Sequence, residues 1–190
     1  FSMNPMKTLG ALGEAGAVVT DDRDLYEEIK MLRYNGTVNK ELCITKGLNA
    51  CIDSLQAAIL VDRLKLVDST VNRRISIATK YNNYFKHCSI KIPQYNSNHM
   101  KSSYYSYTIQ VNDRSGLIKY LSDFGVETKI QHPILMSSQK PYINNKSDVL
   151  KTAKKVVEKI LSIPANEKIT DNQVKKISGL IIKYINKSRL

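Results

Sequence analysis

Apolar residues at intervals of three and four positions predict helices in several parts of the chain. The first helix begins after the acidic pair at residues 21–22, whose side chains can cap it, and ends before Gly36. One face of this helix carries Leu25, Ile29 and Leu32. Near the end of the chain the spacing predicts helices over Ser147–Leu161 and Thr170–Asn186, and Thr170 with Gln173 is a capping-box pattern.

Residues 53–92 contain neither glycine nor proline and predict a long helical stretch. Asp53 and Gln56 resemble a capping box at its start, and apolar residues recur along it at intervals of three to five. A helix of this length rarely belongs to one small domain. We therefore expect a helical spine that joins two lobes or packs against a partner, with a break near residues 68–70.

Other runs predict strands. Gly16–Thr20 is short and apolar, as in a buried strand. In Tyr104–Val111 apolar and polar residues alternate, which indicates one buried face. Val126–Ile130 follows an amphipathic helix closed by Gly125, and Ile163-Pro164 is an extended piece. The residues after about 93 therefore predict a compact α+β lobe.

The chain has 190 residues with 42% apolar content, and 29 Lys plus Arg against 17 Asp plus Glu give a net charge of +12. Such a charge raises the possibility of a nucleic-acid-binding domain. However, Lys151, Lys154 and Lys155 stand at helical spacing between apolar residues, which is typical of a solvated helix face. The chain also contains no recognised RNA- or DNA-binding motif, so this class ranks low.

Three cysteines without a C-x-x-C pair suggest neither a disulfide framework nor a zinc site, and we expect no metal. A reducing cytoplasm fits this cysteine usage. No apolar run approaches the roughly 18 residues that a membrane helix needs. Because the chain begins at Phe1 directly in a motif-rich loop, we expect further residues upstream.

The densest group of chemically capable residues is this opening loop, F-S-M-N-P-M-K-T-L-G-A-L-G-E-A-G. Its glycines let the backbone approach a ligand, and Ser2 and Lys7 supply a hydroxyl and an amine around Pro5. The spacing matches neither a Walker A loop nor a dinucleotide fingerprint. Composition alone leaves Lys7 undecided between a solvated charge and a functional amine.

The order of residues in this loop resembles the DegT/DnrJ/StrS nucleotide-sugar aminotransferases, whose loop reads S-F-x-P-x-K-N-L-G-A-L-G-D-x-G. A second segment, G-L-N-A-C-I-D-S-L-Q-A-A from Gly47, resembles the family's G-Y-N-x-R-x-D-x-L-Q-A-A. Leu48 and Cys51 depart from the tyrosine and arginine of that pattern. Further similarity extends over nearly the whole chain, with Gln131 and His132 standing where histidine and tyrosine are common.

The resemblance implies a role for three residues. Lys7 would bind pyridoxal phosphate covalently and then move a proton. Ser2 would donate a hydrogen bond to the cofactor phosphate, and Asn49 would reach the phosphate site of a neighbouring subunit, which implies a homodimer. The acid that faces the pyridine nitrogen would lie upstream of Phe1, so we expect the 190-residue segment alone to be inactive.

The fold class implied is α/β, as part of a fold-type-I aminotransferase. Residues 1–52 would form the carboxyl-terminal edge of the large cofactor domain, residues 53–92 the helical spine, and residues 93–190 the small α+β domain. The implied reaction moves an amino group, from glutamate, to a nucleotide-linked keto sugar for polysaccharide or glycoside synthesis. The alternative is a non-catalytic dimerisation or sensing module, which the departures at Leu48, Cys51 and Gln131 favour.

Overall fold

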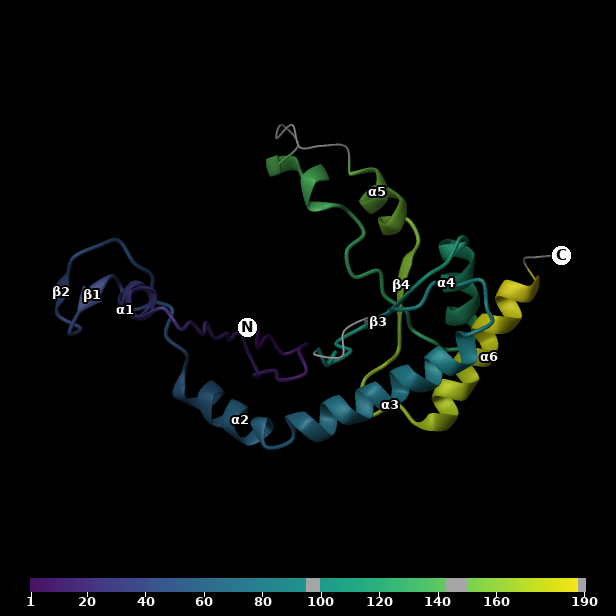
Figure 1. The fold of residues 1–190 in the computed structure, drawn as a ribbon, viewed down its shortest axis with the longest axis horizontal. Coiled ribbons are helices and arrows are strands. Elements are labelled where there is room, and N and C mark those ends of the chain that lie inside the picture. Colours follow the sequence, from purple (N-terminus) through teal and green to yellow (C-terminus); the bar gives the residue numbers. More distant parts are fainter. Residues whose placement is uncertain (95–99, 143–149, 188–190) are drawn as a thin grey trace. The chain divides into compact units, whose positions relative to one another are not determined.

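The computed structural model describes residues 1–94, 100–142 and 150–187, and these residues form two compact units (Figure 1). Unit 1 is Phe1–Ser69 and unit 2 is Thr70–Leu190. Unit 1 contains α1 (Arg23–Leu32), β1 (Thr37–Val38), β2 (Leu42–Cys43), α2 (Ser54–Leu64) and the start of α3 (Val67–Phe85). Unit 2 contains the rest of α3, β3 (Tyr107–Gln110), α4 (Arg114–Asp123), two short 3₁₀ turns (Met136–Ser138 and Lys140–Tyr142), α5 (Lys151–Val157), β4 (Ile160–Ile163) and α6 (Asp171–Lys187).

The start of α1 confirms the predicted cap. The side chain of Asp22 accepts hydrogen bonds from the backbone N–H groups of Asp24 and Leu25, as expected for a residue preceding a helix. The helix ends at Leu32, and Gly36 follows with a φ of 68°, a value that favours glycine. The hairpin β1–β2 then turns through two residues with positive φ.

The predicted long helix is divided into α2 and α3. The break falls at residues 65–66, just before the predicted position, and α3 ends at Phe85 instead of continuing to residue 92. The capping box at Asp53 is wrong, because Asp53 makes no side-chain capping bond and Gln56 bonds to another segment of unit 1. The boundary between unit 1 and unit 2 follows Ser69, inside the region that the sequence predicted to be a helical spine.

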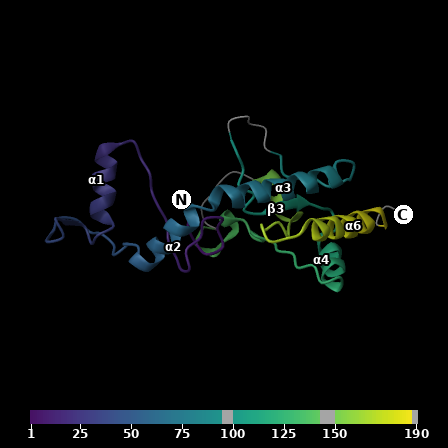
Figure 2. The same cartoon turned by 90° about the horizontal axis from the view of Figure 1, so that it is seen from below.

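A two-stranded antiparallel ribbon lies at the centre of unit 2. In this ribbon Tyr107 pairs with Ile163 and Gln110 with Ile160. Single bridges extend the ribbon on both sides, from Lys91 to Gln110 of β3 and from Lys129 to Ser162 of β4. Helices α3 and α6 run beside each other next to the ribbon (Figure 2), while α4 contacts α6.

The hydrophobic core of unit 2 forms where these helices meet the ribbon. Buried side chains come from α3, both strands, α4 and α6, and the largest of them are Tyr81, Tyr107, Phe85, Ile77 and Ile109. Burial of such side chains provides most of the favourable free energy of folding. Unit 1 differs, because Ala11 and Leu60 are its only buried apolar residues among those that the structure describes.

Three predicted elements differ from the structure. Gly16–Thr20 is not a strand: Gly16 forms one bridge with Ser2, and Val18 and Val19 are exposed. Val126–Ile130 likewise forms only the bridge between Lys129 and Ser162. The helix predicted over Ser147–Leu161 ends at Val157, because the following residues pair with β3; residues 147–149 lie outside the described ranges. The capping box of Thr170 and Gln173 is confirmed, with reciprocal bonds of 2.8 and 3.2 Å.

Candidate active-site loop

The opening segment of unit 1 folds back on itself to form a closed loop. The Met3 amide donates to the Ala15 carbonyl at 2.8 Å, and the Ala17 amide donates to the Phe1 carbonyl at 2.9 Å. A third bond, from the Ala11 amide to the Met3 carbonyl at 2.8 Å, brings the middle of the segment onto its start. The backbone around Lys7 therefore lies between two tied ends.

Lys7 stands at the end of a tight turn. Its backbone amide donates to the Asn4 carbonyl at 2.8 Å, and Pro5 fits the second position of this turn because its φ is already restricted. The Asn4 side chain accepts from the Met6 amide at 2.9 Å and donates to Glu14 at 2.6 Å. These bonds fix the direction in which the chain presents the lysine.

Gly10 is required by close packing inside the loop. A Cβ atom at this position would lie 2.8 Å from the Asn4 carbonyl oxygen and 2.9 Å from that of Pro5. Real Cβ atoms essentially never approach other atoms so closely. The glycine therefore allows the two passes of the loop to touch directly behind the turn of Lys7.

Two residues of α2 bond to the same loop. The Gln56 side-chain oxygen accepts from the amides of Leu12 and Gly13, at 2.8 and 3.1 Å. The Arg63 guanidinium donates to the carbonyls of Gly10 and Ala11. Sequence reasoning assigned Gln56 to a helix cap and gave Arg63 no role. Gln56 and Arg63 are seven residues apart, which places both side chains on one face of the helix. This spacing was the signal in the sequence that the two residues could contact the same segment.

The predicted site residues occupy different positions in unit 1. Lys7 is half-buried in the loop and Ser2 is exposed where the loop closes. Asn49 is exposed and bridges to Tyr34 at the end of α1. The structure thus brings Ser2 and Lys7 into one loop, while the backbone of Asn49 bridges to a different segment.

Thr8, next to Lys7, has a buried hydroxyl group without a hydrogen-bond partner in the described part of the chain. A buried polar atom in this state lowers stability unless a ligand or another group satisfies it. The loop thus combines a primary amine, which condenses with aldehydes, and hydroxyl groups, which suit phosphate oxygens. This set of groups fits a phosphorylated aldehyde such as pyridoxal phosphate.

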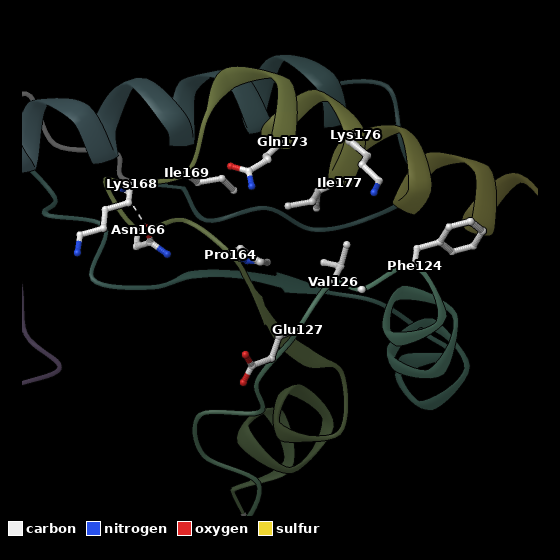
Figure 3. A pocket seen from close by; sticks show the side chains of 11 residues that line it. Phe124, Val126, Glu127, Pro164, Asn166, Lys168, Ile169, Gln173, Lys176 and Ile177 are labelled. Atoms are coloured by element: carbon white, nitrogen blue, oxygen red, sulfur yellow. Dashed lines mark hydrogen bonds between the residues drawn. The ribbon is translucent and has the colours of Figure 1, made fainter.

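Unit 2 contains a separate surface hollow of about 360 Å³, between the end of α4, the segment after β4 and the start of α6 (Figure 3). Its apolar floor includes Val126 and Ile177, and its rim includes Glu127, Lys168 and Lys176. None of the predicted site residues lines this hollow. Across the described ranges, no group of three or more His, Cys, Asp or Glu side chains is placed to hold a metal ion.

The glycine-rich lysine loop, followed by mixed helix and sheet elements, is the architecture of part of a fold-type-I aminotransferase. The structure of DesV from S. venezuelae has a TM-score of 0.92 with this chain at 28% identity, covering 97% of this chain and 50% of that one. The chain belongs to the DegT/DnrJ/EryC1/StrS aminotransferase family, which matches residues 1–181. Enzymes of this family are sugar aminotransferases that depend on pyridoxal phosphate.

Two curated relatives show the range of this family. The "erythromycin biosynthesis sensory transduction protein EryC1" of Saccharopolyspora erythraea is 37% identical over 134 residues, which are 70% of this chain and 36% of that protein. The UDP-2-acetamido-2-deoxy-3-oxo-D-glucuronate aminotransferase of Pseudomonas aeruginosa is 28% identical over 180 residues, 95% of this chain and 50% of that protein. The chain therefore spans half or less of the length of these relatives.

Within the described residues, none of the helices is both long and apolar enough to cross a membrane.

Proposed function

We propose that this chain is the carboxyl-terminal part of a pyridoxal-phosphate-dependent enzyme that moves an amino group from glutamate to a nucleotide-linked keto sugar. The observation that carries this proposal is the closed loop around Lys7, in which the amine, the Ser2 hydroxyl and the buried Thr8 hydroxyl belong to one short segment. The family of the chain and the aminotransferase among its relatives support the class of substrate. The product would serve polysaccharide or glycoside synthesis.

The residues of the loop have distinct tasks in this proposal. Lys7 Nζ would hold the cofactor through its aldehyde and would also move a proton to or from the reacting substrate carbon. Ser2 Oγ donates a hydrogen bond to the cofactor phosphate. The cofactor itself supplies the electron sink that stabilises negative charge on that carbon. The turn from Asn4 to Lys7 orients the lysine for both tasks.

We also propose that the protein works as a homodimer in the cytoplasm. Exposed apolar side chains on unit 1, including Leu48, Leu55 and Val61, support an additional protein surface over this unit. Asn49, next to Leu48, would then act on the cofactor phosphate of the partner. The cysteines Cys43 and Cys51 form no disulfide, which supports a reducing compartment. The boundaries at residues 52 and 92 remain our proposed division between cofactor domain, spine and small domain.

Borohydride trapping tests the assignment of Lys7. The amine condenses with the aldehyde with loss of water, and borohydride reduces the resulting carbon–nitrogen double bond to a stable amine. Peptide mapping of the full-length protein should place the pyridoxyl group on Lys7, and a Lys7→Ala variant should lose it. A label on a different lysine would contradict the assignment. An assay of amino-group exchange between glutamate and a nucleotide-linked keto sugar then tests the reaction.

A second candidate is a non-catalytic sensing or dimerisation module. Leu48 and Cys51 depart from the family pattern beside Asn49, and one relative carries the name of a sensory transduction protein. This candidate predicts no exchange of amino groups by the full-length protein. The trapping experiment separates a module that has kept its cofactor from one that has lost it.

A further inference from the structure

One face of α2 bonds to the backbone of four consecutive loop residues, 10–13. The oxygen of Gln56 accepts from two successive amides, those of Leu12 and Gly13. The guanidinium of Arg63 donates to two successive carbonyls, those of Gly10 and Ala11. Residues seven apart lie two turns along the same side of a helix. We call Gln56 and Arg63 the α2 brace.

The brace satisfies backbone groups that the loop itself leaves unpaired. Ala11 is fully buried, Gly10 is buried and Gly13 is half-buried, whereas Leu12 is exposed. Backbone polar groups in such places need partners, and a loop has no ladder of its own to supply them. One acceptor and one donor from α2 thus replace the neighbouring strand that this segment does not have.

The restraint continues from residues 10–13 to the turn of Lys7. The Ala11 amide bonds to Met3, and Gly10 lies against the carbonyl oxygens of Asn4 and Pro5 without space for even a Cβ atom. A shift of Gly10 or Ala11 must therefore move the turn that ends at Lys7. Two successive sets of contacts therefore connect α2 to Lys7: the bonds from α2 to residues 10–13, and the packing of residues 10–11 against the turn.

We propose that Gln56 and Arg63 are positioning residues that set the orientation of Lys7 toward the cofactor aldehyde. This inference rests on the proposed function of Lys7. It adds two residues of α2 that determine how readily the Lys7 amine reacts. Their effect passes through the loop backbone, which Arg63 contacts at the buried residues 10–11 and Gln56 at residues 12–13.

Two substitutions at Gln56 separate positioning from bulk. Gln56→Met keeps the length of the side chain and removes the acceptor, whereas Gln56→Glu keeps an oxygen that can accept from both amides. Gln94→Met, at an exposed position in unit 2, is the matched control. With the full-length protein and pyridoxal phosphate as the probe, we expect Gln56→Met to lower the rate of borohydride-trapped labelling at Lys7 by about tenfold or more. Gln56→Glu and Gln94→Met should label at close to the wild-type rate.

Hydrogen exchange without added cofactor gives a second, independent measurement. The amides of Leu12 and Gly13 should exchange faster in Gln56→Met than in the wild type, and Gln56→Glu should restore their protection. Arg63→Met, compared with Arg63→Lys, repeats the test at the other half of the brace.

The outcomes distinguish this inference from the proposed function. If the wild type is labelled at Lys7 and Gln56→Met labels equally fast, the positioning role is wrong and the function of Lys7 stands. If no label forms at Lys7 in the wild type, the proposed function fails and the positioning role fails with it, and exchange rates then report only the architecture of the loop. If both Gln56 variants lose the label equally, the shared acceptor is not the cause and the inference is overturned.

Discussion

Replacing Gly10 by alanine should disturb both the stability of unit 1 and the reactivity of Lys7. The added Cβ would lie 2.8 Å from the Asn4 oxygen, 2.9 Å from the Pro5 oxygen and 3.1 Å from the Lys7 oxygen. All three are backbone atoms of the turn that presents the lysine, so a change of side-chain rotamer cannot relieve the contacts. The turn must move by several tenths of an ångström to reach ordinary van der Waals separation.

We expect two measurable effects of Gly10→Ala. Overpacking of this kind lowers the free energy of unfolding by about 1–3 kcal/mol. Misplacement of a reacting group by about 1 Å lowers rates by roughly 100-fold, so a smaller shift should lower the trapping rate at Lys7 by roughly tenfold. Thermal unfolding and borohydride trapping of the full-length protein measure the two effects.

Gly179→Ala is the matched control for this substitution. A Cβ at Gly179 meets nothing within 4 Å, and the residue lies in the helix α6. Alanine is the better helix former there, by about 0.5–1 kcal/mol, so this variant should be slightly more stable and should trap the cofactor normally. If Gly10→Ala matches the wild type in both melting temperature and trapping rate, the close approach of the two passes of the loop does not constrain Lys7.

Two further predictions concern Asp171 and Asn49. Hydrogen bonds from Lys80 and then Arg73 hold the pKa of Asp171 below its usual range, so the carboxylate stabilises unit 2 at neutral pH and this contribution is lost as pH falls below about 4. The stability of Asp171→Asn, measured by circular dichroism, should therefore fall less steeply than that of the wild type as the pH is lowered. The same pH dependence in both proteins would contradict this role. Mixing Lys7→Ala subunits with Asn49→Ala subunits should restore one cofactor site per hybrid dimer, detected as trapped label; hybrids no better than the Asn49→Ala homodimer would show that Asn49 does not act across the interface.

Sequence patterns identified those features of the fold whose partners are close in the chain. Asp22 caps α1 through residues two and three positions later, and Thr170 bonds to Gln173 in the same local way. Gln56 shows the opposite case. The position of Gln56 fits a local helix cap, but its hydrogen-bond partners are 43 and 44 positions away in the chain. A pattern of neighbouring residues does not reveal that a distant backbone group competes for the same side chain.

The strand predicted within Tyr104–Val111 is present as β3, whereas two other predicted strands are absent for a related reason. Apolar runs such as Gly16–Thr20 have strand propensity, but a strand exists only where a neighbouring segment supplies hydrogen bonds. Ile160 and Leu161 fit a helical pattern equally well, and they form a strand because β3 pairs with them. In the candidate site, the order of residues around Lys7 singled out the lysine loop, whereas the contacts of Arg63 arise only in the folded loop.

The pairing of β3 with β4 has a consequence for the order of folding. Their first contact, between Gln110 and Ile160, closes a loop that includes α4 and α5. Loop closure over such a separation costs roughly 3–4 kcal/mol of chain entropy before the ribbon gains any stability. The helices α4 and α6 have local hydrogen bonds and can appear early. We therefore expect the ribbon to form late, so that substitutions at Ile109 or Leu161 mainly accelerate unfolding and leave the folding rate of unit 2 nearly unchanged.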